Sequence, residues 1–382
     1  MKTVLFFSLE EGTMGGIQRV NETLAEALTA RGYRVKNLYL RAVNHKEGVD
    51  TLRPTRPWSF TRGCDVLEKL KEGKIFSAFG LILRRMRDVS WLSADRRRAK
   101  RFLVKEKPDA VITSHYLLLD GIPKPLLSRT YHHVHTSFRE TMRQQDNRKT
   151  LCRYRGKIGF LWLSRNICEK ALSGGFVHSF PVYNPLSFYP PERTLAEKCR
   201  KVVVLTRFSE EKRLPLAVKL LKRAMDQLED ANAFSVSFYG EGSEEAALRD
   251  AIGSDVRFQI MPRTDDVFGV LKEARFTVNT SAFEGFSISI LEAAAAGVPT
   301  VSFDFGEAAS EEITNGKTGF VIPMDDHDAF VEALKRLFLE DGTVKDFSEN
   351  ARAWASSLQK ETVAQEWERL LSRLPLDKTG KA

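Results

Sequence analysis

The chain has 382 residues, with 59 Lys and Arg residues against 50 Asp and Glu residues, and a formal net charge of +9 at pH 7. Its hydrophobic fraction of 42% and charged fraction of 29% are those of an ordinary globular protein, which excludes disordered, collagen-like and disulfide-scaffold classes. Because a domain typically contains roughly 100–200 residues, this length predicts two domains, each with its own core.

The charge is unevenly distributed along the chain. Residues 1–190 contain 34 basic and 17 acidic residues, whereas residues 191–382 contain 25 basic and 33 acidic residues. The first half therefore carries a formal charge of +17 and the second half one of −8. Such a split indicates two domains with different partners.

The first half alternates short apolar runs with segments of helical periodicity. The opening run is short and continues directly into Glu10, without the basic head and longer apolar region of a signal peptide, so we interpret it as the first strand of a cytoplasmic protein. No apolar run approaches the ~20 residues of a membrane-spanning helix. The predicted strands are Thr3–Ser8, Val35–Leu40, Ala110–Thr113, Thr130–Val134 and Gly159–Leu163, and the first predicted helix is Ile17–Ala30.

The segment Trp58–Lys107 breaks this alternation, because it is long, helical in part and rich in arginine. Two interpretations stay open: a solvated helical face, or a surface for an anionic membrane or an anionic acceptor. The second interpretation places the protein peripherally at the inner face of the membrane. The arginines, within residues 84–101, are Arg84, Arg85, Arg87, Arg96, Arg97, Arg98 and Arg101.

The second half repeats the alternation of strand and helix, which predicts a second parallel sheet covered by helices. We therefore predict two Rossmann-like domains, residues 1–185 and 186–359, joined by a proline-containing link. A helical tail at about 360–382 is expected to pack back onto the first domain. The predicted strands are Val202–Thr206, Phe234–Tyr239, Val256–Ile260, Phe276–Thr280, Thr300–Phe303 and Gly319–Ile322.

Two glutamates, Glu284 and Glu292, stand eight positions apart across a turn and the helix that follows it. The small residues Gly285 and Ser287 open that helix, and a Gly-Val-Pro run at 297–299 ends it. Free backbone N–H groups at such a helix start, together with the helix dipole, favour a phosphate or diphosphate. Two turns along, Glu292 is placed to accept hydrogen bonds from a vicinal diol such as a ribose.

The run from Glu284 to Pro299 resembles the E-x7-E signature of the retaining glycosyltransferases of family four, which have the GT-B fold. The resemblance extends over nearly the whole chain and is strongest in residues 200–325. It implies two Rossmann-like domains that face a central cleft. Other segments that resemble donor-side parts of this family are Thr206–Lys212, Tyr239–Gly242, Gly15 with Gly16, and Asn184.

The resemblance implies a role for each of these residues. Glu292 looks like the carboxylate that binds the ribose hydroxyls of the donor nucleotide, and Glu284 like the one near the transferred sugar. Arg207 and Lys212 look like the cations that neutralise the leaving diphosphate, which fixed charges must stabilise where no metal is required. A solvated surface pair is the alternative for these two. The other implied donor-binding residues are Gly15, Gly16, Gly240, Gly285, Phe286 and Ser287.

The first half offers three histidines as candidate site residues. His115 follows a predicted strand and matches the position where the family has a histidine near the transferred sugar, so it is a predicted catalytic residue. His133 and His135 lie at the C-terminal end of a predicted strand, where ligands bind in α/β sheets, and are candidates for acceptor binding. A structural role stays open for His135. A His-x-His pair suits a metal, but no third ligand has supporting spacing, so we predict no metal site.

Three segments qualify the resemblance. Residues 325–328 (Asp-Asp-His-Asp) look like the Asp-x-Asp metal motif of the other glycosyltransferase fold, but they precede a helix, where acidic residues serve as N-caps. Met261–Arg263 stands where the family has a glycine beside the nucleotide base. The contacts to the base, and therefore its identity, stay open. Ser302–Ile313 is similar to the branch that decorates teichoic-acid polymers or glycosylates serine-rich adhesins.

The resemblance implies a hexosyltransferase that moves a hexose or N-acetylhexosamine from a UDP-sugar, with retention, to a cell-envelope glycan, lipid-linked or polymer acceptor. No cofactor is expected. The N-terminal domain is expected to bind the acceptor and the C-terminal domain the donor. The alternatives are a nucleotide-sugar epimerase, a sugar-phosphate synthase with a soluble acceptor, and a non-enzymatic polyanion binder. No RNA-module signature accompanies the basic half, so nucleic acid is not an expected partner.

Overall fold

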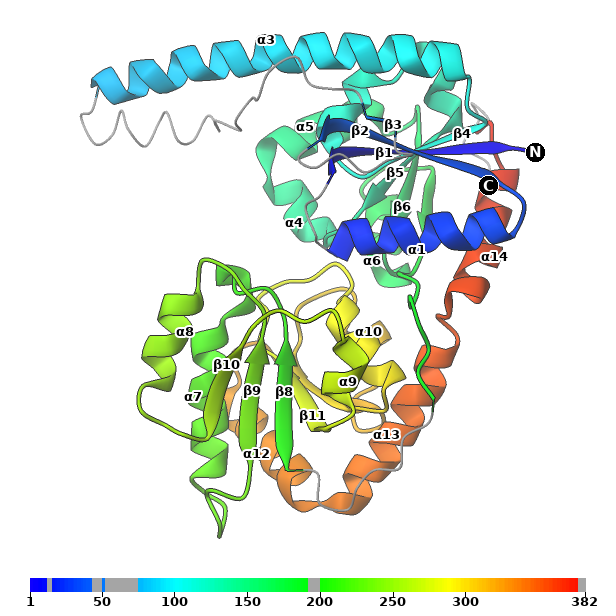
Figure 1. The fold of residues 1–382 in the computed structure, drawn as a ribbon. Coiled ribbons are helices and arrows are strands. Elements are labelled where there is room, and N and C mark those ends of the chain that lie inside the picture. Colours follow the sequence, from blue (N-terminus) through cyan, green and yellow to red (C-terminus); the bar gives the residue numbers. More distant parts are fainter. Residues whose placement is uncertain (12–15, 43–49, 52–74, 192–199, 377–382) are drawn as a thin grey trace.

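The computed structural model describes residues 1–11, 16–42, 50–51, 75–191 and 200–376, which form two parallel α/β domains (Figure 1). The first sheet has seven strands in the order β3-β2-β1-β4-β5-β6-β7, and the second has six in the order β10-β9-β8-β11-β12-β13. The pairings between these strands are parallel. The predicted two-domain α/β architecture is thus confirmed.

The strands of the first domain follow the apolar runs of the sequence. β4 and β5 have the predicted bounds, since each is a continuous buried run in the middle of the sheet. β7 is not among the strand ranges predicted for this half. It lies at the edge of the sheet, where the missing N–H of its proline is tolerated. The bounds are β1 Thr3–Glu11, β2 Arg34–Ala42, β3 Asp50–Thr51, β4 Ala110–Thr113, β5 Thr130–Val134, β6 Gly159–Trp162 and β7 Ser179–Pro181.

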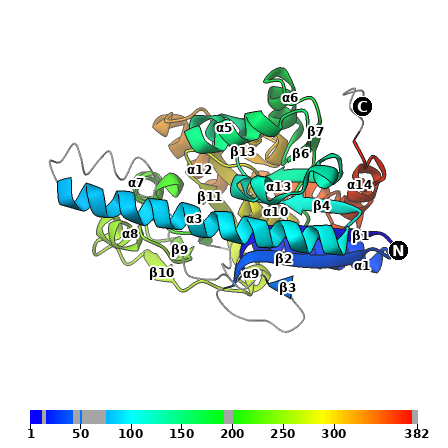
Figure 2. The same cartoon turned by 90° about the horizontal axis from the view of Figure 1, so that it is seen from above.

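Helices cover both faces of this sheet. Residues of α1 pack into the core cluster that also holds Phe6 and Trp162, whereas those of the long helix α3 pack against Leu5 and Phe7 on the other face. Figure 2 shows α3 running across the first sheet from above. The helices are α1 Gly16–Ala30, α3 Ile75–Glu106, α4 Phe138–Arg143, α5 Gln145–Tyr154 and α6 Arg165–Ser173, with short 3₁₀ turns η1 Tyr116–Gly121 and η2 Lys124–Arg129.

The second domain repeats this architecture. Its strands are β8 Lys201–Leu205, β9 Ser235–Tyr239, β10 Phe258–Met261, β11 Ala274–Asn279, β12 Thr300–Phe303 and β13 Gly319–Ile322. Its helices are α7 Leu214–Met225, α8 Glu245–Ile252, α9 Val267–Leu271, α10 Ile288–Ala295, α11 Ala309–Glu312, α12 His327–Leu339 and α13 Asp341–Ser356, with a turn η3 Glu210–Lys212. The predicted cap at 325–328 is confirmed, because the Asp326 side chain accepts the N–H of Ala329 at 3.0 Å at the start of α12.

The chain crosses between the domains twice, and the two crossings lie side by side. After β7 it runs towards the second domain, and it returns through α13 to α14 (Lys360–Ser372). At the crossing, the N–H of Leu186 donates to the carbonyl of Leu358 at 2.8 Å. α14 then packs on the first domain, where Trp367 is buried beside Phe6. The domains are therefore joined by a paired segment rather than a single strand of chain.

Candidate functional site

The loop that carries Glu284 meets the first domain through a glycine. A Cβ atom on Gly285 would lie 2.8 Å from the Cα of Thr136 and 2.9 Å from the carbonyl oxygen of His135. Both residues directly follow β5, at the C-terminal edge of the first sheet. Only a residue without a side chain permits this approach. The structure thus brings the Glu284 loop and the His135 segment together, although 284 − 135 = 149 positions separate them in the sequence.

Glu284 is held by a cation and a hydroxyl of its own domain. The Nζ atom of Lys212 lies 2.5 Å from its Oε1, and the Ser281 Oγ donates to the same oxygen at 2.8 Å. Both partners of the ion pair are largely buried, with 15% and 14% of their side chains exposed. Lys212 is positioned by the turn η3, and its carbonyl accepts from the Thr280 hydroxyl at 2.8 Å. Lys212 is therefore fixed beside Glu284, whereas the sequence grouped it with Arg207.

Glu292 faces the first domain from the middle of α10. Its Oε1 accepts from the Nη1 of Arg19 on α1 at 2.8 Å, across the domain interface. Burial raises the pKa of this carboxyl to about 7, although the nearby Arg19 opposes the shift. The crevice around the pair measures only about 10 Å³. A ribose that reached Glu292 would therefore have to share the carboxylate with Arg19 or displace it.

The start of α10 is bound by a carboxylate that the sequence did not single out as a site residue. The two oxygens of Glu312, on α11, accept from the N–H of Ser287 at 2.9 and 3.0 Å. Burial raises the pKa of Glu312 well above its ordinary value, against the hydrogen bond from Ser287. The expectation that small residues leave this helix start open to a phosphate is therefore wrong for the Ser287 N–H, because a folded-back carboxylate already satisfies it.

Arg207 does not join the Lys212–Glu284 pair. Its side chain is 72% exposed, and its Nη2 pairs with Glu211 at 3.0 Å. The backbone next to Arg207 is hydrogen-bonded to the glycine turn after β9. The N–H of Phe208 donates to the carbonyl of Glu241 at 2.9 Å. A Cβ on Gly240 would lie 1.9 Å from the carbonyl oxygen of Thr206, so this glycine allows the two loops to touch.

His115 lies at the end of β4 and caps the turn η1. Its Nδ1 accepts from the N–H of Leu117 at 3.3 Å, and its ring stacks on Tyr116. Burial, with a smaller effect from the guanidinium of Arg96, lowers the pKa of His115 to about 4. The side chain is therefore neutral at pH 7 and suited to hydrogen bonding rather than to charge pairing.

His133 and His135 have adjacent rings, with centroids 4.0 Å apart. His133 has no exposed surface, and its ring packs against the edge of Trp367. In this conformation α14 covers His133, so an acceptor could reach it only after a rearrangement, and its role in acceptor binding stays a prediction. His135 is only partly buried and lies beside Gly285. Burial lowers its pKa to about 3, so it is neutral as well.

The remaining predicted residues anchor the interface. Phe286 is buried, with its ring against Tyr183, and its carbonyl accepts from the side chain of Asn184 at 3.4 Å. A Cβ on Gly16 would lie 2.9 Å from the Cδ1 of Ile288, so α1 approaches the start of α10 closely. Gly15 lies outside the described residues.

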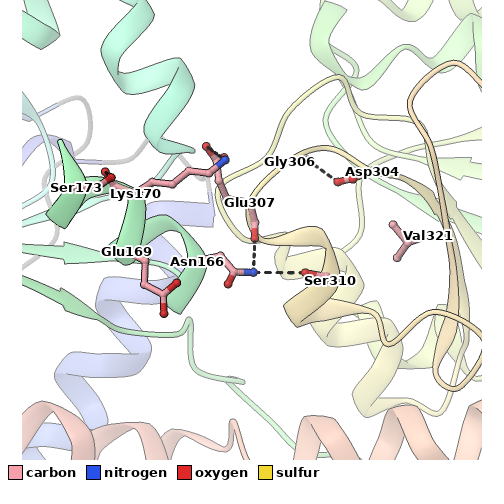
Figure 3. A pocket seen from close by; sticks show the side chains of 9 residues that line it. All are labelled: Asn166, Glu169, Lys170, Ser173, Asp304, Gly306, Glu307, Ser310 and Val321. Carbon is pink, nitrogen blue, oxygen red and sulfur yellow. Dashed lines mark hydrogen bonds and ion pairs between the residues drawn. The ribbon is translucent and has the colours of Figure 1, made fainter.

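A polar cavity of about 570 Å³ opens elsewhere along the interface, between α6 and the segment after β12. Figure 3 shows Asn166 donating to the carbonyl of Glu307 and to the hydroxyl of Ser310, with Lys170 reaching Glu307 above them. None of the residues predicted for the site lines this cavity. The cavity is lined by residues of both domains and by neither Glu284 nor Glu292.

Within the described ranges, no three His, Cys, Asp or Glu side chains gather closely enough to hold a metal ion.

In the part of the chain that the structure describes, no helix is both long and apolar enough to cross a membrane.

Known proteins resemble this chain in sequence and in fold. Residues 199–340 match the family model described as glycosyl transferases group 1. The crystal structure of TarM superposes with a TM-score of 0.74 at 14% identity, over 97% of this chain and 99% of that chain. HepE of Anabaena, solved with UDP-glucose, superposes with a TM-score of 0.73 at 15% identity, over 98% and 100%. The chain therefore shares the fold of these two structures over nearly its whole length, and its second domain is similar to the group 1 glycosyl transferases.

The family match falls on the second domain, which carries Glu284, Glu292 and Lys212. The poly(glycerol-phosphate) alpha-glucosyltransferase of Bacillus subtilis is 26% identical over 178 residues, 46% of this chain and 26% of that protein. The chain thus spans about a quarter of the length of this curated relative. The GT-B fold predicted from the sequence is confirmed for the two domains that the structure describes.

Two residues at the site were not predicted from the sequence. Arg19 follows Gly16 by one helical turn, so the two share a helix face. That spacing was the only local signal for Arg19. Glu312 belongs to the segment 302–313, which was singled out for its likeness to acceptor-specific branches rather than for its carboxylate. The partner of Arg19 is 273 positions away in the chain, and that of Glu312 is 25 positions away on another element.

Proposed function

We propose that this protein transfers a hexose or N-acetylhexosamine from a UDP-sugar to a hydroxyl of a cell-envelope glycan, with retention of configuration. The observation that carries the proposal is the Lys212–Glu284 pair, set on a loop that abuts the end of β5. The Bacillus relative is named as acting on poly(glycerol phosphate), and HepE was solved with UDP-glucose. Both names support this donor and acceptor chemistry.

We assign the donor nucleotide to the second domain and the ribose to Glu292. A vicinal diol donates two hydrogen bonds, which a carboxylate accepts well once it is ionised. Arg19 favours the ionised form of Glu292, because its guanidinium lies 2.8 Å away. Binding of the ribose is then coupled to a rearrangement of the α1–α10 contact, and this coupling connects donor binding with domain closure.

For the transfer step, the bond between the anomeric carbon and the diphosphate oxygen breaks while the acceptor oxygen bonds the same face of the sugar. The acceptor proton passes to the departing phosphate oxygen. Lys212 stabilises the charge that develops on the diphosphate, and Arg207 can swing in because its side chain is exposed. Glu284 orients Lys212, and neutral His115 and His135 hydrogen-bond the sugar and acceptor hydroxyls. No covalent intermediate is needed.

The test replaces Glu292 by alanine. Transfer of radiolabelled sugar from UDP-glucose or UDP-N-acetylglucosamine to poly(glycerol phosphate) should fall by roughly 100-fold or more, and UDP should bind roughly tenfold more weakly in calorimetry, because charge-assisted hydrogen bonds of about 1.5–3 kcal/mol are lost. The matched control is Glu332→Ala, an exposed glutamate on α12.

The thermal unfolding midpoint of each variant shows whether the fold is kept. Wild-type turnover and UDP affinity in Glu292→Ala would contradict the assignment of the ribose to this residue. Conversion of the UDP-sugar without any acceptor would instead indicate an epimerase. Failure of every nucleotide-sugar to bind the wild-type protein would contradict the proposed function as a whole.

A further inference from the structure

Helix α3 has one face that packs on the first domain. Buried residues recur along it at spacings of three and four, which is the period of a single helix face. Leu92, Ala99 and Leu103 pack with strand residues of the first sheet. Asp88 and Asp95 are buried on the same face. This face holds the C-terminal two thirds of the helix to the protein.

The N-terminal part of α3 projects beyond the body of the domain (Figures 1 and 2). There the opposite face of the helix carries large apolar side chains that are exposed to solvent. Phe79 is 58% exposed and Met86 66%, and both lie one to two turns from similar neighbours. Because positions three, four and seven apart share a face, these residues form one stripe. The apolar stripe consists of Phe79, Ile82, Leu83, Met86 and Val89.

Towards the C-terminus the same outer face becomes basic. Arg97, Lys100 and Arg101 are exposed and continue the line of the apolar stripe at helical spacing. The helix contains three acidic residues, and all three lie on the inner side: Asp88 and Asp95 are buried, and Glu106 pairs with Lys36 at 2.5 Å. The outer face therefore presents apolar and cationic groups without a carboxylate.

The arginines that the sequence grouped together have different surroundings in the structure. Arg96 donates to the carbonyl of Leu117 at 2.9 Å and pairs with Asp120, so it serves the fold. Arg98 pairs with Asp95 at 3.7 Å. The side chains of Arg84 and Arg85 lie outside the described residues. The basic part of the outer face is thus carried by Arg97, Lys100 and Arg101.

We propose that the outer face of α3 binds the surface of an anionic phospholipid bilayer. The apolar stripe would enter the boundary between headgroups and acyl chains, and the three basic residues would contact headgroup phosphates. Two observations select this partner. A soluble polyanion offers nothing for the apolar stripe to contact, and a second copy of the chain would bring the same positive charges against this face. The proposal is independent of the sugar-transfer reaction.

The position of α3 fits such a docking mode. In Figure 1 the helix lies on the side of the first domain that is turned away from the second domain, and Figure 2 shows it in front when the molecule is viewed from that side. A bilayer on this face leaves the contact between Gly285 and the end of β5 uncovered. Membrane binding and the motions of the second domain are therefore compatible.

The test is co-sedimentation of the full chain with vesicles at low salt. Wild type should bind phosphatidylcholine vesicles containing about one third phosphatidylglycerol, and should not bind pure phosphatidylcholine. Arg97→Gln/Lys100→Gln/Arg101→Gln should weaken binding about 100-fold, since each basic residue contributes about fivefold near an anionic surface. Phe79→Ser/Leu83→Ser/Met86→Ser should weaken it at least tenfold.

Matched controls remove the same groups from the second domain. Lys219→Gln/Lys317→Gln/Lys345→Gln removes three exposed charges, and Val256→Ser/Leu339→Ser removes two exposed apolar side chains. Both should bind vesicles nearly as wild type does. The thermal unfolding midpoints of all variants should agree, because the substituted side chains are exposed.

Three results would overturn the proposal. The first is absence of wild-type binding to the anionic vesicles at low salt. The second is undiminished binding after the apolar substitutions, which would leave a purely electrostatic contact with a polyanion. The third is a wild-type dimer in light scattering that the apolar substitutions dissociate while vesicle binding stays unchanged, which would assign the stripe to a second copy of the chain.

Discussion

At the scale of single residues, the site depends on carboxyl groups in very different surroundings. Glu284 has a lysine beside it, and Glu292 has an arginine from the other domain. Glu312 instead accepts from the backbone N–H of Ser287. A buried carboxylate without a cation in direct contact is costly, and its protonated form is favoured. Glu312 therefore acts as a local cap for α10 rather than as a charge in the site.

The capping hydrogen bond from Ser287 predicts different effects for two substitutions of Glu312. Glu312→Ala should lower the free energy of unfolding by about 1–3 kcal/mol, because it leaves the Ser287 N–H buried without an acceptor. Glu312→Gln keeps an acceptor and should retain stability at pH 7. Urea unfolding measures both, and equal losses in the two variants would contradict a capping role.

The stability difference between wild type and Glu312→Gln should also depend on pH, in a direction that the pKa shift of Glu312 determines. The folded state raises the pKa of Glu312 well above 4.5, so its contribution to wild-type stability is present below pH 4.5 and is lost as the pH rises through the folded pKa. Glu312→Gln does not titrate. The stability of this variant relative to wild type should therefore increase as the pH rises from 4.5 to 7, measured by urea unfolding at several pH values.

At the scale of elements, the site is made where the loop before α10 meets the end of β5. The contact is between backbones, since Gly285 lies against His135 and Thr136. It sets how closely Glu284 approaches the histidines of the first domain. A change of about 1 Å in such an approach can reduce turnover by roughly 100-fold.

Gly285→Ala should therefore reduce sugar transfer by tenfold or more, because its Cβ would lie 2.8 Å from backbone atoms that cannot rotate away. UDP affinity should change less than transfer does, since Glu292, to which the ribose is assigned, lies further along α10 and not at this contact. Gly342→Ala, at a position where nothing lies within 4 Å, is the matched control. Full transfer activity in Gly285→Ala would show that the two domains do not need this approach.

At the scale of the whole molecule, the domains are held together by the paired crossing and by the hydrogen bonds of one carboxylate, Glu311, which we call the polar latch. The carboxylate of Glu311, on α11, accepts from the N–H groups of Arg165 and Asn166 at 3.0 and 2.7 Å. It also accepts from the hydroxyl of Tyr183 at 2.6 Å. A carboxylate at the start of α6 is favoured by the helix dipole. The latch thus connects the first domain, the link and the second domain at one residue.

Glu311→Ala should loosen this arrangement without unfolding either domain. Hydrogen–deuterium exchange at the N–H groups of Arg165 and Asn166 should accelerate by roughly 10- to 100-fold, because charge-assisted hydrogen bonds are lost. Amides in the middle of β8 and β9 should exchange as in wild type. Glu332→Ala serves again as control, and unchanged exchange at Asn166 would show that the latch does not hold the domains.

Much of the fold was predictable because its determinants are local. The strands 110–113, 130–134, 300–303 and 319–322 have the predicted bounds, since each is a short, mostly buried run rich in β-branched or aromatic residues between helical segments. The spacing of Glu284 and Glu292 placed both at one turn and helix. Asp326 was predicted as a cap from its place before α12. These features depend on neighbours within a few positions.

The sequence by itself thus determined the two sheets, the α10 region with its two glutamates, and the basic character of the first half. Only the tertiary structure decided that Arg19 pairs with Glu292, that Glu312 caps α10, that Trp367 covers His133, and which arginines of α3 face outward. Local propensity cannot specify such pairs, because they join residues far apart in the chain and form only when the domains and helices dock. Packing and the satisfaction of buried polar groups select them.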